Sequence, residues 1–496
     1  MATNREAILT SGAIPTTLFR LAGPMSVGLF AQISFTLADT LFVARLGTDA
    51  LAALGFAFPV VFVISNITMG LGTATSAVVS QAIGRGDQHL VRRYTTDSLI
   101  LSLVIVVALS AGGYVTVKPL FAALGARGET LHLVRQYMAI TYLGIAFMVI
   151  PTISINAIRA TGDTVTPSAI MVVAALVNVV LDPIMIYGLF GFPRLEVAGA
   201  ALASVIGRIT SCIAALAFLH FRERMITFQR PRLDEVLRSW RSLLTIGVPA
   251  SATNIMVPLS NLFVTAIAAR AGKEVVAALG AGMRVTAFTS IPVYALSASL
   301  VPFVGQNWGA GQYRRARRSK RHSIQFGAVW GGLCFVALWA AAPHIAALFS
   351  QEEAVRREIM LYLRIVPLGH ALQNSFIFMT SILNSIHRAV ISTLLMAVRM
   401  FVLYVPLATL GAWWWGGAGL FGGMAAANAL AAPVPALAAA AGTRAAVLQA
   451  LAVTGADDLA VPGGGESGQV VLRAAQEIGQ DSLHVGPGGL ADRGLE

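Results

Sequence analysis

Long stretches of apolar residues, separated by short polar segments, dominate this chain. Runs such as 99–109, 139–155, 169–180 and 201–218 carry almost no charge. A helix needs about 20 mostly apolar residues to cross a bilayer. The pattern predicts twelve membrane-spanning helices, near residues 16–41, 51–80, 96–122, 133–157, 166–190, 197–221, 243–269, 276–306, 323–348, 361–386, 390–411 and 417–441. The runs lack the two-residue alternation of barrel strands, which favours an all-α membrane fold.

The composition supports a membrane protein. Hydrophobic residues make up 56% of the chain and charged residues 12%, too little charge to cover a soluble protein of this length. The first apolar stretch is too long for a signal peptide and lacks a small-residue cleavage site, so we expect no cleaved signal. Both cysteines, Cys212 and Cys334, fall in predicted spans, and we interpret them as packed apolar residues.

The net charge of +12 is concentrated in alternate loops, after the second, fourth, sixth and eighth spans. The densest loop carries Arg314, Arg315, Arg317, Arg318, Lys320 and Arg321. The positive-inside rule therefore places both termini in the cytoplasm, and we expect the cytoplasmic (inner) membrane of a bacterium. Because the basic runs are short, lie beside spans and lack interleaved aromatic residues, they favour contact with membrane lipid over nucleic acid binding.

The two halves of the chain match without a gap when they are offset by 225 residues, the difference between 249 and 24. Pro24, Arg45, Gln81, Gly84 and Arg92 fall on Pro249, Arg270, Gln306, Gly309 and Arg317. The match predicts two six-helix lobes, residues 1–221 and 243–443, joined by a cytoplasmic linker, 222–242. Because six is an even number, both copies have the same orientation, so they form a parallel repeat.

The last segment, 444–496, differs from the rest because it is polar and rich in glycine. No apolar pattern there lasts long enough to span a membrane. We expect a disordered cytoplasmic tail.

Several local motifs resemble a known transporter family. They are Ala38-Asp39-Thr40-Leu41-Phe42-Val43-Ala44-Arg45-Leu46-Gly47 in the first span, Gln81-Ala82-Ile83-Gly84-Arg85-Gly86-Asp87 after the second, Arg159-Ala160-Thr161-Gly162-Asp163 after the fourth, Asn178-Val179-Val180-Leu181-Asp182-Pro183 in the fifth and Ala198-Gly199-Ala200-Ala201 in the sixth. Together they resemble the multidrug and toxic compound extrusion (MATE) family. The resemblance implies a V-shaped, twelve-helix antiporter that exports lipophilic, often cationic, drug-like compounds against H⁺ or Na⁺.

The resemblance also implies a cation site in the N-terminal lobe. The DinF-like branch of the family has such a site, which corresponds here to Asp39, Asn178 and Asp182, with Ser204 in place of a threonine. The NorM-like branch relies on acids in its seventh and tenth spans. Neither predicted span 243–269 nor 361–386 contains an acid, which favours the DinF-like branch.

The residues themselves lead to the same positions. A charge at mid-bilayer costs at least about 2.5–3.5 kcal/mol, so an intramembrane acid is a functional-site hypothesis. Asp39 and Asp182 are the clear acids of the predicted spans, and Asn178 lies one helical turn before Asp182. In the repeat, Asp39 aligns with Val264 and Asp182 with Val405. Acids that only hold helices together should recur in the second copy, which favours a coupling role.

Our mechanistic hypothesis is that proton entry to Asp39 and Asp182 repacks the first span around a hinge at Pro24. The repacking lowers the affinity for the drug, which is released outward. Carboxylate and amide oxygens also suit Na⁺ at Asp39, Asn178 and Asp182, but H⁺ is the preferred coupling ion. We expect no other cofactor and a monomeric protein.

Other polar or flexible side chains in the spans are candidates for lining the drug cavity. These are Gln32, Met25, Met69, Asn156, Asn254, His370 and Asn374. The arginines Arg208, Arg284 and Arg399 are interpreted as pairing helices or snorkelling to the interface.

Three other functions fit the sequence less well than an antiporter. A membrane enzyme is disfavoured because the Gly-x-Gly-Asp match at residues 84–87 lies in a basic loop, outside the spans. The chain has no Gly-x-x-x-x-Gly-Lys loop, which excludes a nucleotide-driven pump of that type. A flippase for lipid-linked precursors, from the same superfamily, is the alternative function. It requires a broad cationic cavity, and few arginines fall inside the predicted spans.

Overall fold

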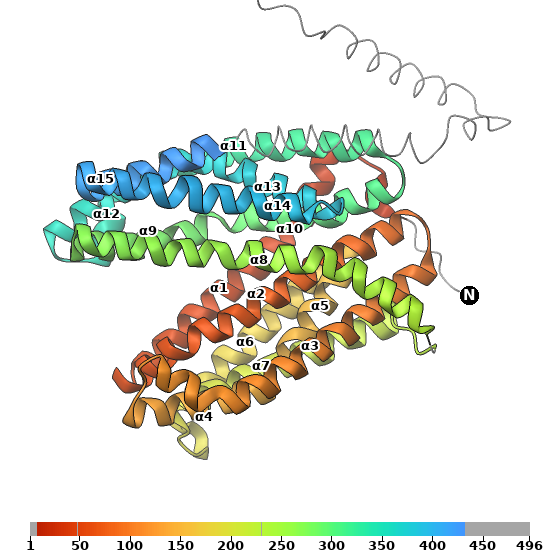
Figure 1. Cartoon of the computed structure of the whole chain (residues 1–496), viewed down its shortest axis with the longest axis horizontal. Helices are drawn as coiled ribbons and strands as arrows, with labels where there is room; N and C mark the ends of the chain where they lie inside the picture. Colours follow the sequence, from red (N-terminus) through yellow and green to blue (C-terminus); the bar gives the residue numbers. More distant parts are fainter. Residues whose placement is uncertain (1–6, 47, 230, 432–496) are drawn as a thin grey trace, which may run out of the picture. The chain divides into compact units, whose positions relative to one another are not determined.

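The structure is a computed structural model that describes residues 7–46, 48–229 and 231–431. These ranges consist of helices and short connections, without a β-strand. The first half forms a bundle of seven helices, coloured red to yellow-green in Figure 1. They are α1 (Ile14–Ala44), α2 (Thr48–Gly84), α3 (Gln88–Ala123), α4 (Gly128–Gly144), α5 (Ala146–Ala160), α6 (Val165–Tyr187) and α7 (Glu196–Ala217). Three short helical turns accompany them, η1 (Ile8–Thr10), η2 (Leu189–Gly191) and η3 (Phe218–Arg222).

The second half forms a bundle of the same kind, coloured green to blue in Figure 1. Its helices are α8 (Leu233–Ala271), α9 (Lys273–Thr289), α10 (Ile291–Gly309), α11 (Tyr313–Phe349), α12 (Glu353–Ile365), α13 (His370–Ser385), α14 (Ala389–Ala397) and α15 (Val405–Ala431). The short turn η4 (Val366–Gly369) joins α12 to α13, and the π-helical segment η5 (Val398–Tyr404) joins α14 to α15.

The described helices account for all twelve expected spans. Seven spans are single helices, and two are the bent pairs α4–α5 and α9–α10, with angles of 44° and 50°. The pair α12–α13 forms the tenth. The last stretch, Ala389–Ala431, folds back on itself, since Trp415 and Gly416 leave the helical conformation. Gly411 then packs against Gly419, so the eleventh and twelfth spans form an antiparallel hairpin.

The helix ends confirm the internal repeat. Adding 225 to the ends of α2 gives Lys273 and Gly309, the start of α9 and the end of α10. The α4–α5 pair runs from Gly128 to Ala160. Adding 225 gives Glu353 and Ser385, where the α12–α13 pair begins and ends. The copies differ at this point, because α2 is unbroken where α9 and α10 are bent. Pro292, the second residue of α10, has no N–H to donate across this break.

The ends of the second lobe differ from the sequence prediction. The eighth helix begins at Leu233, ten residues before the predicted lobe boundary, so the linker after η3 is shorter than expected. Asp234 and Glu235 lie in its first turn, where negative charge stabilises a helix N-terminus. The predicted tail, 444–496, and the last part of the twelfth span lie outside the described residues.

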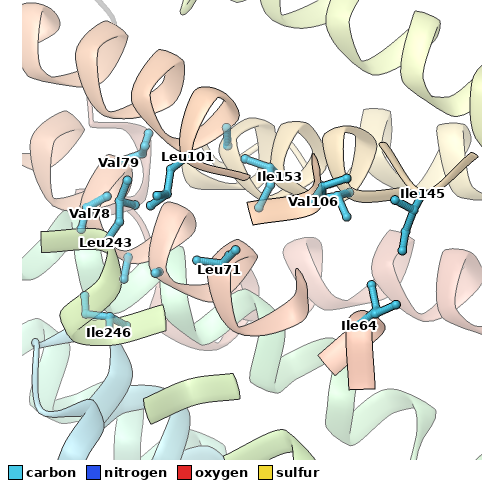
Figure 2. Close-up of a cluster of buried hydrophobic side chains, with 14 of the residues drawn as sticks. Ile64, Leu71, Val78, Val79, Leu101, Val106, Ile145, Ile153, Leu243 and Ile246 are labelled. Atoms are coloured by element: carbon cyan, nitrogen blue, oxygen red, sulfur yellow. The ribbon is translucent and has the colours of Figure 1, made fainter. Parts of the chain in front are cut away.

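A large apolar core joins α2 to its neighbours. Figure 2 shows Leu71 and Val78 of α2 beside Leu101 of α3 and Ile153 of α5. Leu243 and Ile246 of α8 belong to the same cluster, so the second bundle is anchored to the first through α8. Burial of this apolar surface is worth about 25 cal/mol per Å² where it replaces contact with water, and within the membrane close packing takes over this role.

The two bundles also meet through a pair of glycines related by the repeat. A methyl group on Gly84 would overlap the backbone of Gln306 and lie 2.9 Å from its carbonyl carbon. A methyl group on Gly309 would overlap the backbone of Gln81 in the same way, 3.0 Å from its carbonyl carbon. Glycine at both positions therefore allows α2 and α10 to touch, backbone against backbone. We call Gln81, Gly84, Gln306 and Gly309 the inter-bundle seal.

The glutamines of the seal repeat this symmetry in their hydrogen bonds. Gln306 Nε2 donates to the Ala160 carbonyl oxygen at 2.7 Å, and Gln81 Nε2 donates to that of Ser385 at 2.6 Å. Ala160 and Ser385 are themselves related by the offset of 225. Each bundle thus fastens the last turn of a helix, α5 or α13, to the other bundle. Gln306 Oε1 also accepts from the Leu9 N–H at 3.1 Å, which ties the N-terminal turn to the seal.

One side chain breaks the symmetry of the seal. His387 occupies the left-handed conformation, φ 60°, at the position where the first half has Gly162, φ 95°. Its Nδ1 lies 3.0 Å from Gln81 Nε2, which can only donate, so the ring accepts this bond in its neutral form. Burial, and secondly the positive charge of Arg85, lower the pKa of His387 below its ordinary 6.5. The seal therefore contains a group sensitive to pH in the second half only.

Candidate functional site

The fifth span carries the most deeply buried of the predicted site residues. Asp182 is fully buried on α6 and Asn178 is 3% exposed, one turn earlier. The Asn178 amide is oriented so that both its nitrogen and its oxygen form hydrogen bonds. Nδ2 then donates to Asp182 Oδ2 at 2.8 Å, and Oδ1 accepts from the Ser204 hydroxyl at 3.3 Å. The structure thus brings together three of the four residues predicted for cation coupling. Asn178 links the carboxylate of α6 to the hydroxyl of α7.

Asp39 of α1 is the fourth predicted residue, and it interacts electrostatically with Asp182 of this group. It is half-buried, and its Oδ1 is buried without a hydrogen-bond partner within the described ranges. Its negative charge interacts with that of Asp182. Tyr137 of α4 interacts electrostatically with both carboxylates. A buried carboxylate oxygen without a donor is costly, and binding of a proton or a hard cation would satisfy it.

Arg208 is the member of the group that sequence reasoning missed. It was interpreted as a pairing or snorkelling residue, but its charge acts on Asp39 and on Tyr137. It lies on α7 one turn after Ser204, so the four-residue spacing from Ser204 was the available signal. With both aspartates ionised the group holds two negative charges and one positive charge. Uptake of a single proton would therefore make it neutral.

A third acid within the predicted spans, beyond Asp39 and Asp182, was not recognised from the sequence. Asp97 falls within the predicted third span and is fully buried. It forms a buried ion pair with Arg93, one turn earlier on α3, in which Arg93 Nε donates to Asp97 Oδ2 at 2.7 Å. An acid that is already paired in this way is suited to a structural role rather than to proton exchange.

The equivalent positions of the second bundle are apolar. Val264, the repeat partner of Asp39, is 1% exposed and packs in an apolar cluster with Tyr362. Tyr362 is the repeat partner of Tyr137. The acids in the described helices of this bundle all lie in the first two turns of α8, α9 or α12. The tenth span begins eight residues earlier than expected and therefore includes two of them, Glu353 and Glu358. Glu358 Oε2 is buried beside Gly417.

The residues predicted to line the drug cavity are not brought together. Gln32 and Met69 are exposed and Asn254 is half-buried, whereas Met25, Asn156, His370 and Asn374 are buried inside a bundle. Met25 packs on Ser168, and Asn374 Nδ2 donates to the Gly327 carbonyl oxygen at 3.0 Å. His370 and Asn374 line a small cavity with Trp330 and Cys334. The predicted hinge, Pro24, lies inside α1, which continues through it unbroken.

Comparison with known proteins places these features in a family. The MatE family model matches residues 24–184 and 249–410, one stretch in each bundle. A FAD transporter from Shewanella oneidensis is 35% identical over 405 residues, 82% of this chain and 90% of the relative. The probable multidrug resistance protein YoeA of Bacillus subtilis is 26% identical, over 71% of this chain and 78% of the relative.

A solved structure shows the same fold. An Asp-to-Asn mutant of the Vibrio cholerae MATE transporter VcmN superposes with a TM-score of 0.84 at 28% identity, and the match covers 87% of this chain and 97% of that one. The matched family model, the two six-span bundles and the twelve spans agree with one another. The chain belongs to the MATE family of integral membrane transporters.

Proposed function

We propose that this protein is a proton-coupled efflux antiporter whose coupling site is the group Asp39, Asn178, Asp182 and Ser204, joined by Arg208. The observation that carries the proposal is the pair of unequal aspartates. Asp182 is fully buried and accepts from Asn178, while Asp39 Oδ1 has no hydrogen-bond partner among the described residues. Desolvation and a neighbouring like charge both favour the protonated form of a carboxyl group, so protons can bind and leave this pair near neutral pH.

The charge distribution supports the direction of transport. Arg85 follows Gly84 directly, and the basic run from Arg314 begins five residues after Gly309. The positive-inside rule therefore assigns the seal to the cytoplasmic face of a bacterial inner membrane, with both termini in the cytoplasm. The structure then represents a state closed toward the cytoplasm, in which protons would load from outside and cargo would leave outward.

The available energy is sufficient for export. One proton that moves down 100 mV supplies about 2.3 kcal/mol. A pH difference of one unit adds about 1.4 kcal/mol. Together these support a cargo gradient of several hundred-fold for one proton per molecule. Na⁺ at the same oxygens is the alternative coupling ion, because carboxylate, amide and hydroxyl oxygens suit a hard cation.

The names of the relatives support two classes of cargo. Several are drug exporters or probable drug resistance proteins, which supports the export of lipophilic, often cationic, compounds by a monomeric transporter. The relative with 35% identity is a FAD transporter, which supports a second candidate, a nucleotide-like anionic cargo. A flippase for lipid-linked precursors remains the alternative within the same fold.

The coupling proposal is tested by ethidium export from cells that express Asp39→Asn or Asp182→Asn. Each change keeps the size of the side chain and removes the group that binds the proton. We expect export to fall to the level of cells without the transporter, at equal protein abundance in the membrane. Export at the wild-type rate in both variants would rule out coupling at these acids.

A further inference from the structure

The second bundle, like the first, contains a charged side chain buried within it, that of Arg399. Arg399 lies in the π-helical segment η5 and is 3% exposed, so burial excludes snorkelling and leaves helix pairing as the one of its two expected roles that the structure supports. It lies twelve residues after His387, which contacts Gln81 of the seal. Twelve residues correspond to about 18 Å along a helix and hence to the middle of the bilayer. π-Helical segments inside α-helices occur frequently at functional sites.

The partners of Arg399 are neutral. Its Nη2 donates to Asn428 Oδ1 at 2.7 Å, and Asn428 Nδ2 in turn donates to Gln373 Oε1 at 3.2 Å. The guanidinium carbon lies 4.8 Å from the centre of the Phe376 ring. Its Nε is buried without a hydrogen-bond partner in the part of the chain that the structure describes. One donor of the guanidinium is therefore unused.

The charge of Arg399 is not balanced from within the bundle. The titratable groups that act on it are two tyrosines, Tyr404 and Tyr294, and no carboxylate of the described residues does so. Arginine cannot discard its proton at any physiological pH, unlike a buried lysine or histidine. A buried cation without an anion is strongly unfavourable. This bundle thus carries an uncompensated positive charge, whereas the first bundle carries the two aspartates.

Tyr294 connects this charge to the accessible surface. It is 47% exposed on α10, a helix that also packs against α1 and α2 of the first bundle. The charges of Tyr294 and Arg399 act on each other, so this side chain relates the exposed side of α10 to the surroundings of the guanidinium.

We infer that Arg399, Asn428, Gln373 and Tyr294 form a subsite for a phosphate or carboxylate group of the exported molecule. The inference rests on the proposed function and selects between its two classes of cargo. Guanidinium groups bind phosphate and carboxylate oxygens through two parallel N–H donors, and amide and phenol donors complete such a site. An anionic cargo with a planar aromatic part, such as a flavin nucleotide, fits this chemistry better than a lipophilic cation does.

Binding measurements on the whole protein test the inference independently of proton coupling. The purified transporter is placed in nanodiscs of zwitterionic lipid, and the affinities for FAD, riboflavin and ethidium are measured by fluorescence. Riboflavin carries the same flavin ring without phosphate. We expect FAD to bind more tightly than riboflavin, and Arg399→Gln to weaken FAD binding about tenfold or more while riboflavin and ethidium change little. Arg399→Lys, which keeps the charge, should recover part of the loss.

A second variant separates an anion site from a structural role. Asn428→Asp keeps the shape of the side chain and supplies Arg399 with an internal carboxylate at the present 2.7 Å contact. If Arg399 only holds helices together, this change is neutral or stabilising and leaves FAD affinity intact. If Arg399 receives an anion from the cargo, the added carboxylate competes, and FAD affinity falls about as far as in Arg399→Gln. Arg364→Gln is the matched control, because Arg364 is an arginine of the same bundle outside the proposed subsite. Like Arg399 it lies over an aromatic ring, 5.2 Å from that of the half-exposed Trp339.

Three results would overturn the inference. The first is equal affinity for FAD and riboflavin in the wild-type protein. The second is undiminished FAD binding by both Arg399→Gln and Asn428→Asp. The third is loss of FAD binding when the nanodiscs contain phosphatidylglycerol, which would assign the subsite to a lipid headgroup. Absence of FAD-driven proton movement in a protein that still binds FAD through Arg399 would instead contradict the proposed antiport.

Discussion

The two glycines of the inter-bundle seal give the most direct prediction about conformation. Replacing Gly84 or Gly309 by alanine adds a methyl group closer than 3.0 Å to the backbone of the opposite helix, where ordinary contact begins at 3.4 Å. Since the obstacle is a backbone carbonyl, it cannot rotate away, and the helices must separate. Overpacking of this kind costs about 1–3 kcal/mol. That energy applies only to the closed state, so the ratio of open to closed molecules should rise about 5- to 150-fold.

Spin-label distances across the seal can measure this ratio. His89 and Arg314 are exposed, lie just beyond Gly84 and Gly309, and are related by the offset of 225. Labels are attached to His89→Cys and Arg314→Cys in a chain where Cys212 and Cys334 are replaced by serine. Double electron–electron resonance then reports the distance distribution in nanodiscs. We expect one short distance in the parent protein and an added longer population in Gly84→Ala and Gly309→Ala.

Gly280→Ala is the control for this experiment. Gly280 lies in α9 of the same bundle as Gly309, and a methyl group there would meet nothing within 4 Å. It should leave the distances unchanged and, since alanine favours helix, stabilise the protein slightly. Unchanged distributions in both Gly84→Ala and Gly309→Ala, with folded protein, would refute the claim that close backbone approach holds the seal.

Two further predictions concern titratable groups outside the coupling site. Because the closed seal lowers the pKa of His387 and an open seal would restore its ordinary 6.5, the open state binds more protons. The longer label distance should therefore gain population as the pH falls through about 6.5, and this response should vanish in His387→Gln, which a pH series of the same distances checks. Asp97→Asn should lower the midpoint of thermal unfolding, since loss of one partner of a buried ion pair costs about 3–5 kcal/mol. Arg93→Gln should have a similar effect, and the double variant should be less unstable than the two losses added together.

Much of the fold could be predicted because membrane helices reveal their length in sequence. The apolar runs and the offset of 225 were sufficient for the twelve spans and the two bundles. The breaks were less visible, since α2 and the α9–α10 pair have similar apolar patterns and Pro292 stands at the break itself. The early start of α8 was missed because its first turns are polar, and hydropathy alone does not detect a helix that extends beyond the membrane.

The site was predictable to the extent that intramembrane charge is rare. Asp39 and Asp182 stood out for that reason, and the spacing of Asn178 from Asp182 implied a shared face. Arg208 and Arg399 were given a structural interpretation because sequence does not show whether a long side chain reaches the interface. Burial and the identity of the neighbours decide this, and both depend on packing between helices that are far apart in the chain.

The seal shows a similar limit. The recurrence of Gln81 and Gly84 as Gln306 and Gly309 was visible in the sequence, but their contact with one another was not. A repeat predicts that two elements have the same structure, and the contact across it arises only when the two copies face each other. His387 could not be recognised as part of the seal, because its repeat partner is a glycine.

The central claim is that a duplicated scaffold carries its coupling chemistry in the first half only. Proteoliposomes that contain a pH-sensitive dye, and are otherwise free of a proton gradient, test it most directly. A gradient of ethidium or FAD should drive protons in the opposite direction in the wild-type protein. Asp39→Asn and Asp182→Asn should abolish this proton movement, whereas Val264→Asn, the matched change in the second half, should retain it. Proton movement at the wild-type rate in both aspartate variants would contradict the account.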